Sequence, residues 1–108
     1  MVIFDKEYHK NWYLKNRSKR LLQQTQRKNA NTARVREIKS ITPCEDCGNT
    51  FHPVCMDFDH PNKDKHKNVA QMLSYSWERI QKEIDKCELV CANCHRLRTH
   101  SRRRGEEA

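Results

Sequence analysis

The sequence predicts a small α+β domain that follows a helical arm. Residues 1–42 contain neither glycine nor proline and carry apolar residues at helical spacing, which favours helix. Apolar stretches at residues 50–59 and 87–90 are short enough for β-strands, and a helical pattern follows each of them. We therefore expect an arm over residues 1–42, a domain over residues 43–105 and a tail over residues 106–108.

Length and composition limit what can hold this domain together. With 108 residues, of which 35% are hydrophobic, the chain cannot bury a large core and needs additional cross-links. Its six cysteines could supply them as disulfides or as metal ligands. The first residues do not resemble a signal peptide and no apolar run reaches membrane-spanning length, so we expect a cytoplasmic protein without membrane association. A reducing cytoplasm favours metal ligation over disulfides.

The positive charge of the chain is concentrated in the arm. The net charge is +8, and residues 1–43 hold eleven lysines and arginines against three acidic residues. Residues 44–108 hold eleven of each sign, so a polyanion such as nucleic acid would be attracted most strongly to the arm. Two interpretations stay open: the arm is only a solvated helical extension, or it lies along nucleic-acid phosphates. The candidate phosphate-binding side chains are Lys15, Arg17, Lys19, Arg20, Arg27 and Lys28 in the arm and Lys67 in a later loop.

Aromatic side chains mark the beginning of the arm. Phe4, Tyr8 and Trp12 recur at every fourth residue, which places them on one face of a helix. The polar segment 23–32 is a candidate break between two helices, and Pro43 ends the helical pattern. One or two helices are therefore expected before the domain begins.

Two Cys-x-x-Cys motifs predict a structural zinc site. Cys44 and Cys47 form the first motif, and Cys91 and Cys94 form the second after 43 intervening residues. Four thiolates in two such motifs suit tetrahedral zinc. One motif alone would also fit a redox dithiol, but no βαβ pattern surrounds either of them. The two remaining cysteines, Cys55 and Cys87, are expected to be small buried thiols.

The first helix predicted in the domain covers residues 76–86. Ser76 is a candidate N-cap, because its hydroxyl can accept a hydrogen bond from the first turn. Trp77, Ile80 and Ile84 follow at helical spacing and form one apolar face. We expect this helix to pack that face on the core and to have a structural role.

The second predicted helix covers residues 92–104 and begins at the second cysteine motif. His95 and Arg98 share a face of it, whereas His100 lies about 140° around the helix from His95. Gly105 is a suitable residue for the end of the helix.

Asp59 and His60 stand at the end of the strand predicted at residues 50–59. A strand fixes the backbone at such a position, and the following loop leaves the imidazole accessible, which suits catalysis. An ordinary acidic turn with a solvated histidine would give the same two residues, so this pair alone does not establish a site.

Three motifs taken together resemble the HNH endonucleases, in particular their small zinc-bearing type. The resemblance covers residues 43–100. The motifs are Cys44-x-x-Cys47-Gly48, Phe58-Asp59-His60 and Cys91-x-x-Cys94-His95-x-x-Arg98-Thr99.

This resemblance implies a ββα-metal core, also called a His-Me finger, in which two antiparallel strands and a helix surround one divalent ion. It implies that His60 is the general base and that Asp59 and His95 bind the catalytic ion, which would be Mg²⁺, Mn²⁺ or another divalent ion. Arg98 stands where the family has a lysine, and we expect it to contact phosphate. Lys86 stands where the family has its middle asparagine, so the sequence departs from the pattern there.

The expected function is metal-dependent hydrolysis of DNA phosphodiester bonds, by nicking or by double-strand cleavage. The expected partners are DNA, a structural zinc and a catalytic divalent ion, without a small-molecule cofactor. A monomer or a homodimer fits, and the resemblance suits a bacterial or phage-infected cell. The alternative is a noncatalytic zinc module that binds nucleic acid, which would need neither Asp59 nor His60.

Overall fold

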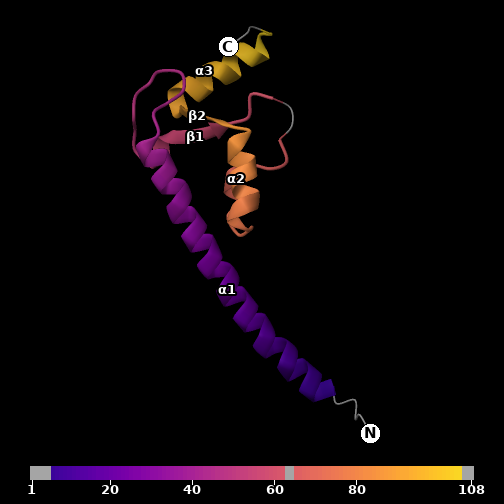
Figure 1. Ribbon diagram of the computed structural model, residues 1–108. Coiled ribbons are helices and arrows are strands. Elements are labelled where there is room, and N and C mark those ends of the chain that lie inside the picture. The colour runs from indigo at the N-terminus through magenta and orange to yellow at the C-terminus, as the bar shows by residue number, and fades with distance from the viewer. Residues whose placement is uncertain (1–5, 63–64, 106–108) are drawn as a thin grey trace.

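The computed structural model describes residues 6–62 and 65–105. Over these residues the chain forms three α-helices and one two-stranded antiparallel sheet, which confirms the predicted α+β class. The long first helix projects from a small domain, so the molecule measures 70 × 29 × 19 Å (Figure 1). In chain order the elements are α1 (Lys6–Ile41), η1 (Pro53–Cys55), β1 (Met56–Asp59), η2 (Val69–Gln71), α2 (Trp77–Asp85), β2 (Glu88–Cys91) and α3 (Ala92–Arg103), where η marks a 3₁₀-helix.

Helix α1 is continuous, and the candidate break at residues 23–32 does not occur. Six of its ten residues, three glutamines with Arg27, Lys28 and Ala30, are good helix formers, and the other four are asparagines and threonines. Its polar side chains also bond within the helix, as the Thr25 hydroxyl does when it donates to the Leu21 carbonyl at 2.9 Å. Tyr8 and Trp12 are exposed, and Phe4 lies outside the described residues.

The last third of α1 packs against the domain. The Asn31 side-chain amide donates to the backbone carbonyls of Leu73 and Tyr75, at 2.9 and 2.8 Å. Val35 is buried in an apolar cluster with residues from η2, α2 and the turn between them: Val69, Met72 and Ile80. The helix ends close to the expected boundary at residue 42, but its residues from Asn31 onward are part of the packed domain.

The sheet is shorter than the sequence predicted. Proline has no backbone N–H to donate to a ladder, and the segment that begins at Pro53 forms a 3₁₀ turn before β1. In the register of the two strands Met56 lies opposite Cys91, and Asp59 lies opposite Glu88. A second apolar cluster forms on this sheet and includes Cys44, Met56 and Val90.

Helices α2 and α3 follow the predicted spans within one residue at each end. Ile80 of α2 is fully buried, and Trp77 and Ile84 pack partly buried against the same cluster. Ser76 occupies the N-cap position, although its side chain makes no capping hydrogen bond. None of the helices in the described residues is long and apolar enough to cross a membrane.

Candidate metal centre and active site

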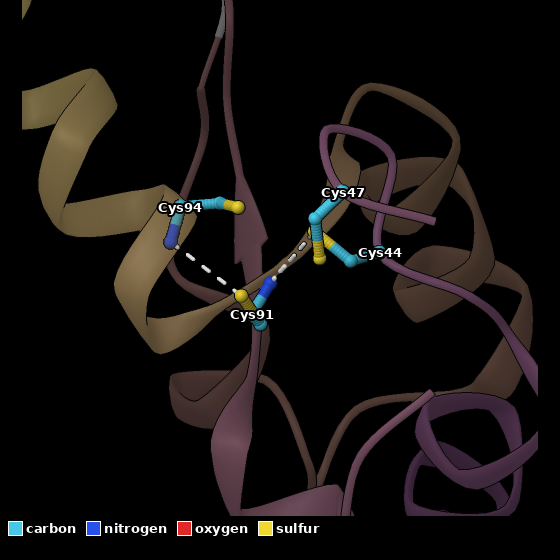
Figure 2. Close-up of side chains that lie close together, drawn as sticks. All are labelled: Cys44, Cys47, Cys91 and Cys94. Carbon is cyan, nitrogen blue, oxygen red and sulfur yellow. Dashed lines mark hydrogen bonds between the residues drawn. The ribbon is translucent and has the colours of Figure 1, made fainter. Parts of the chain in front are cut away.

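The two cysteine motifs come together at one place. Cys44 and Cys47 lie in the loop after α1, Cys91 ends β2, and Cys94 lies in the first turn of α3 (Figure 2). Their four sulfur atoms lie within 4.8 Å of one another. Tetrahedral zinc with bonds of about 2.3 Å would hold sulfurs about 3.8 Å apart. This cysteine cluster can therefore hold a structural metal ion such as zinc, as the spacing predicted.

Backbone N–H groups point at the sulfurs of this cluster. The N–H of Cys91 donates to the Cys44 sulfur at 3.3 Å, and the N–H of Cys94 donates to the Cys91 sulfur at 3.5 Å (Figure 2). Burial opposes ionisation of Cys44, but the N–H groups of Cys47, Cys91 and Asp46 outweigh it and lower the pKa of Cys44 to about 6. The hydrogen bond with Cys91, together with burial, raises the pKa of Cys94 to about 12. Without a cation Cys94 therefore keeps its proton, and all four cysteines could be thiolates only with a cation between them.

The glycine after the first motif has a defined role. Gly48 has a φ of +75°, a backbone conformation that residues other than glycine rarely adopt. In this turn its N–H donates to the Cys44 carbonyl at 2.8 Å. This turn closes the motif, and the sulfurs of Cys44 and Cys47 lie in the same cluster.

Asp59 and His95 converge beside the cysteine cluster. Helix α3 turns back over the sheet, and His95 Nε2 lies 3.5 Å from Asp59 Oδ1. Two neighbouring ligands of one ion, at bonds of about 2.1 Å, would be about 3.0 Å apart in an octahedral site and about 3.4 Å apart in a tetrahedral one. The other ring nitrogen, Nδ1, lies 3.1 Å from Asp57 Oδ2. The two residues that the sequence assigned to a catalytic ion are therefore placed where they could share one.

Two arginines also bind Asp59. Arg102 forms a bidentate ion pair with this carboxylate, with hydrogen bonds of 2.8 and 2.6 Å. Arg98 Nη1 also donates a hydrogen bond to its Oδ2, at 2.8 Å. The hydrogen bonds from Arg102 lower the pKa of Asp59 to about 2 despite its burial, so the carboxylate is ionised. Sequence reasoning missed Arg102 as a partner of Asp59. The sequence does indicate this position, because Arg102 lies four residues after Arg98 and seven after His95, and this spacing places all three on one helical face.

Arg98, which we expected to contact phosphate, is bonded to three carboxylates. Its Nε and Nη2 each donate to Asp46 at 2.6 Å, and its Nη1 donates to Asp59 and, at 3.2 Å, to Glu88. The side chain is only 9% exposed. Arg98 therefore ties the first cysteine motif to both strands and to α3, and a phosphate could reach it only by displacing these carboxylates.

Replacing Arg98 by alanine should lower the free energy of unfolding by about 3 kcal/mol, because the buried Asp59 loses a partner while Arg102 still compensates in part. Chemical denaturation of the metal-loaded protein measures this change. Arg96→Ala, which removes an exposed arginine from the same helix, should have little effect. Equal stability of the two variants would contradict the structural role of Arg98.

His60 follows β1 directly and is more enclosed than the sequence suggested. Its side chain is 8% exposed, and Nε2 lies 3.3 Å from the Cys87 sulfur and 3.7 Å from Glu83 Oε2. It is therefore not a solvated turn histidine. Cys87 is half-buried, whereas Cys55 is exposed, contrary to the expectation of a buried thiol.

The predicted phosphate-binding side chains of the arm are exposed and surround α1. Helical spacing puts them in three rows, because residues four, seven or eleven apart lie nearly in line. Lys67 is also exposed, and its ammonium donates to the Tyr75 hydroxyl at 2.6 Å. A duplex touching one side of α1 could contact only part of the set. The rows are Lys15 with Lys19, Arg20 with Arg27, and Arg17 with Lys28.

Compared with family models, curated proteins and solved structures, the chain matches none of them. Its functional interpretation therefore rests on the contacts of its own side chains.

Proposed function

We propose that the protein is a metal-dependent endonuclease that hydrolyses DNA phosphodiester bonds. The observation that carries this proposal is the convergence of Asp59 and His95, 3.5 Å apart, next to His60 in the chain and beside the cysteine cluster. A carboxylate oxygen and an imidazole nitrogen are donors that first-row divalent ions and Mg²⁺ or Mn²⁺ accept, and two protein ligands leave room for a substrate. The ββα order of β1, β2 and α3 agrees with the HNH resemblance.

In this proposal Asp59 and His95 hold the ion, and Asp57 orients His95. By accepting a hydrogen bond from Nδ1, Asp57 leaves the lone pair of Nε2 directed towards Asp59. A bound divalent ion supplies positive charge that stabilises the negative charge developing on the phosphate. Arg102 binds the same carboxylate, and its side chain is 41% exposed, so it would be free to turn to a phosphate if an ion took its place at Asp59.

His60 acts as the general base. An imidazole readily accepts a proton near neutral pH, and this one comes directly after a metal-binding aspartate at the end of a strand. The cysteine cluster, loaded with zinc, fixes the junction of β2 and α3, and His95 is the residue immediately after Cys94. A zinc ion held by the cysteine cluster would thus also fix the backbone next to His95.

A noncatalytic zinc module that binds nucleic acid is the second candidate. The contact of Asp59 with two arginines favours it, because these cations already neutralise the carboxylate without a metal ion. Incubating supercoiled plasmid with the purified protein and Mg²⁺ or Mn²⁺ separates the two candidates. The endonuclease should produce relaxed circles, and EDTA at a dose that leaves zinc bound should stop the reaction. DNA binding without cleavage under all these conditions would favour the second candidate.

The arm should bind phosphates without sequence preference. Replacing Lys15, Arg17, Lys19 and Arg20 together by glutamine removes positive charge while keeping good helix formers. The fold should be unaffected, because α1 packs on the domain through Asn31 and the residues that follow it. The slope of log affinity against log salt should fall by about 0.9 for each phosphate that the variant no longer neutralises. Lys82→Gln on α2 serves as the control, and an unchanged slope in the fourfold variant would show that the arm has another role.

A further inference from the structure

The carboxylate of Glu83 is buried and incompletely bonded. Its side chain is 2% exposed, and Oε1 accepts a hydrogen bond from the backbone N–H of His66 at 2.9 Å. Burial acts against ionisation, but the hydrogen bonds from His66 and Lys86 outweigh it and lower the pKa of Glu83. Within the described residues, Oε2 is a buried polar atom with no hydrogen-bond partner. Such an atom is costly and calls for an explanation.

This oxygen faces His60. The distance from Glu83 Oε2 to His60 Nε2 is 3.7 Å, slightly longer than a hydrogen bond. The Lys86 ammonium lies closer to the same oxygen, at 3.3 Å, and forms an ion pair with it, although the geometry is not that of a hydrogen bond. Oε2 is therefore placed where a small movement of the ring would give it a hydrogen bond from Nε2–H.

Cys87 adds a second constraint on the same ring nitrogen. Its thiol donates to the backbone carbonyl of Glu83 at 3.2 Å, so the lone pairs of sulfur are left for His60 Nε2 at 3.3 Å. Burial, together with the charge of Glu83, raises the pKa of Cys87 to about 11, which keeps the proton on sulfur. A sulfur whose proton is already donated can only accept, and its partner must then be Nε2–H.

We propose that Glu83 and Cys87 are positioning residues that hold His60 as its Nε2–H tautomer, with the lone pair of the general base on Nδ1. Both groups next to Nε2 are acceptors, and no hydrogen bond within the described residues engages Nδ1. The free lone pair, which a general base needs, is therefore on Nδ1. The catalytic use of Nδ1 rests on the proposed function, whereas the tautomer itself does not.

Glu83→Gln tests the proposal most sharply. The His66 N–H keeps the amide oxygen at the Oε1 position, so the amide nitrogen takes the place of Oε2 and presents hydrogens to Nε2. The ring should respond by moving its proton to Nδ1. The catalytic rate constant should then fall at least about tenfold, up to the loss in His60→Ala, with little change in KM for DNA. Glu78→Gln, an exposed change on the same helix, should leave the rate unchanged.

A second pair of variants tests the thiol. Cys87→Ser keeps one donor and one acceptor and should retain the Nε2–H tautomer and most of the rate. Cys87→Ala removes the acceptor and should give a mixture of tautomers and a lower rate. Cys55→Ala, at an exposed free thiol, is the matched control and should behave as the unmodified protein.

The tautomer is read from ¹⁵N NMR of the imidazole nitrogens of zinc-loaded protein, with the His60 signals identified by their loss in His60→Ala. The expected result is a protonated Nε2 in the unmodified protein and a protonated Nδ1 in Glu83→Gln. A protonated Nδ1 in the unmodified protein, or an unchanged tautomer and rate in Glu83→Gln, overturns the proposal. If the unmodified protein cuts no DNA, the proposed function fails, while the NMR result still decides the inference about His60.

Discussion

Replacing Cys44 by serine should yield a protein that holds no zinc and has no cooperative unfolding transition in its domain. The apolar clusters are small, and Cys44 is itself a buried member of one of them. Zinc binding in small domains contributes about 10–16 kcal/mol, which equals or exceeds the whole stability of an ordinary domain. Within the described residues, the loop after α1 is joined to β2 and α3 by this cluster, by Arg98 and by the backbone hydrogen bond from Glu45 to Leu89.

Metal analysis and near-UV circular dichroism measure this outcome together. About one zinc per chain is expected in the unmodified protein, and none in Cys44→Ser. Near-UV signals report the domain, whereas far-UV signals are dominated by the 36 residues of α1. Cys55→Ser, at an exposed thiol outside the cluster, should keep both zinc and fold. A folded protein without zinc, or a disulfide between Cys44 and Cys47 in freshly prepared material, would contradict the zinc site.

Substitutions at His60, Asp59 and His95 should fail in different ways. His60→Ala should keep metal and DNA binding but lose about a hundredfold or more in cleavage rate, because it removes a general base. Asp59→Asn and His95→Ala should instead weaken binding of the catalytic ion, and excess Mn²⁺ should restore part of the rate. None of the three residues belongs to the cysteine cluster, so zinc content should not change.

His100→Ala is the control for this series. His100 is exposed on α3 and lies on a different side of the helix from His95. The variant should therefore cleave at nearly the unmodified rate. If His100→Ala were as inactive as His95→Ala, the catalytic ion would have been assigned to the wrong face of α3.

The features that local spacing determines could be predicted from the sequence. The four cysteines were found because zinc ligands recur at fixed separations, and the structure brings them together. The family resemblance paired Asp59 with His95; α3 begins beside Met56 at the other end of the sheet and turns back over the strands, which brings His95 to Asp59. Helix α2 was found from the spacing of its apolar residues.

Features that depend on packing between distant elements could not be predicted in this way. Whether Arg98 faces solvent or carboxylates depends on where the loop of Asp46 lies, 52 residues away in the chain. The enclosure of His60 by Glu83 and Cys87 depends on how α2 sits against the end of β1. Asn31 likewise has its partners 42 and 44 residues away, so the sequence pattern does not distinguish the packed end of α1 from the free arm.

The proposed catalysis is tested most directly by the rate of nicking of supercoiled DNA, measured for the unmodified protein and His60→Ala over a range of Mn²⁺ concentrations. Both proteins must first be shown to contain the same amount of zinc and to bind DNA equally. We expect Mn²⁺-dependent relaxed circles from the unmodified protein and a rate at least about a hundredfold lower from His60→Ala at every concentration. Equal rates in the two proteins, or no cleavage by either with any divalent ion, would contradict the proposed function.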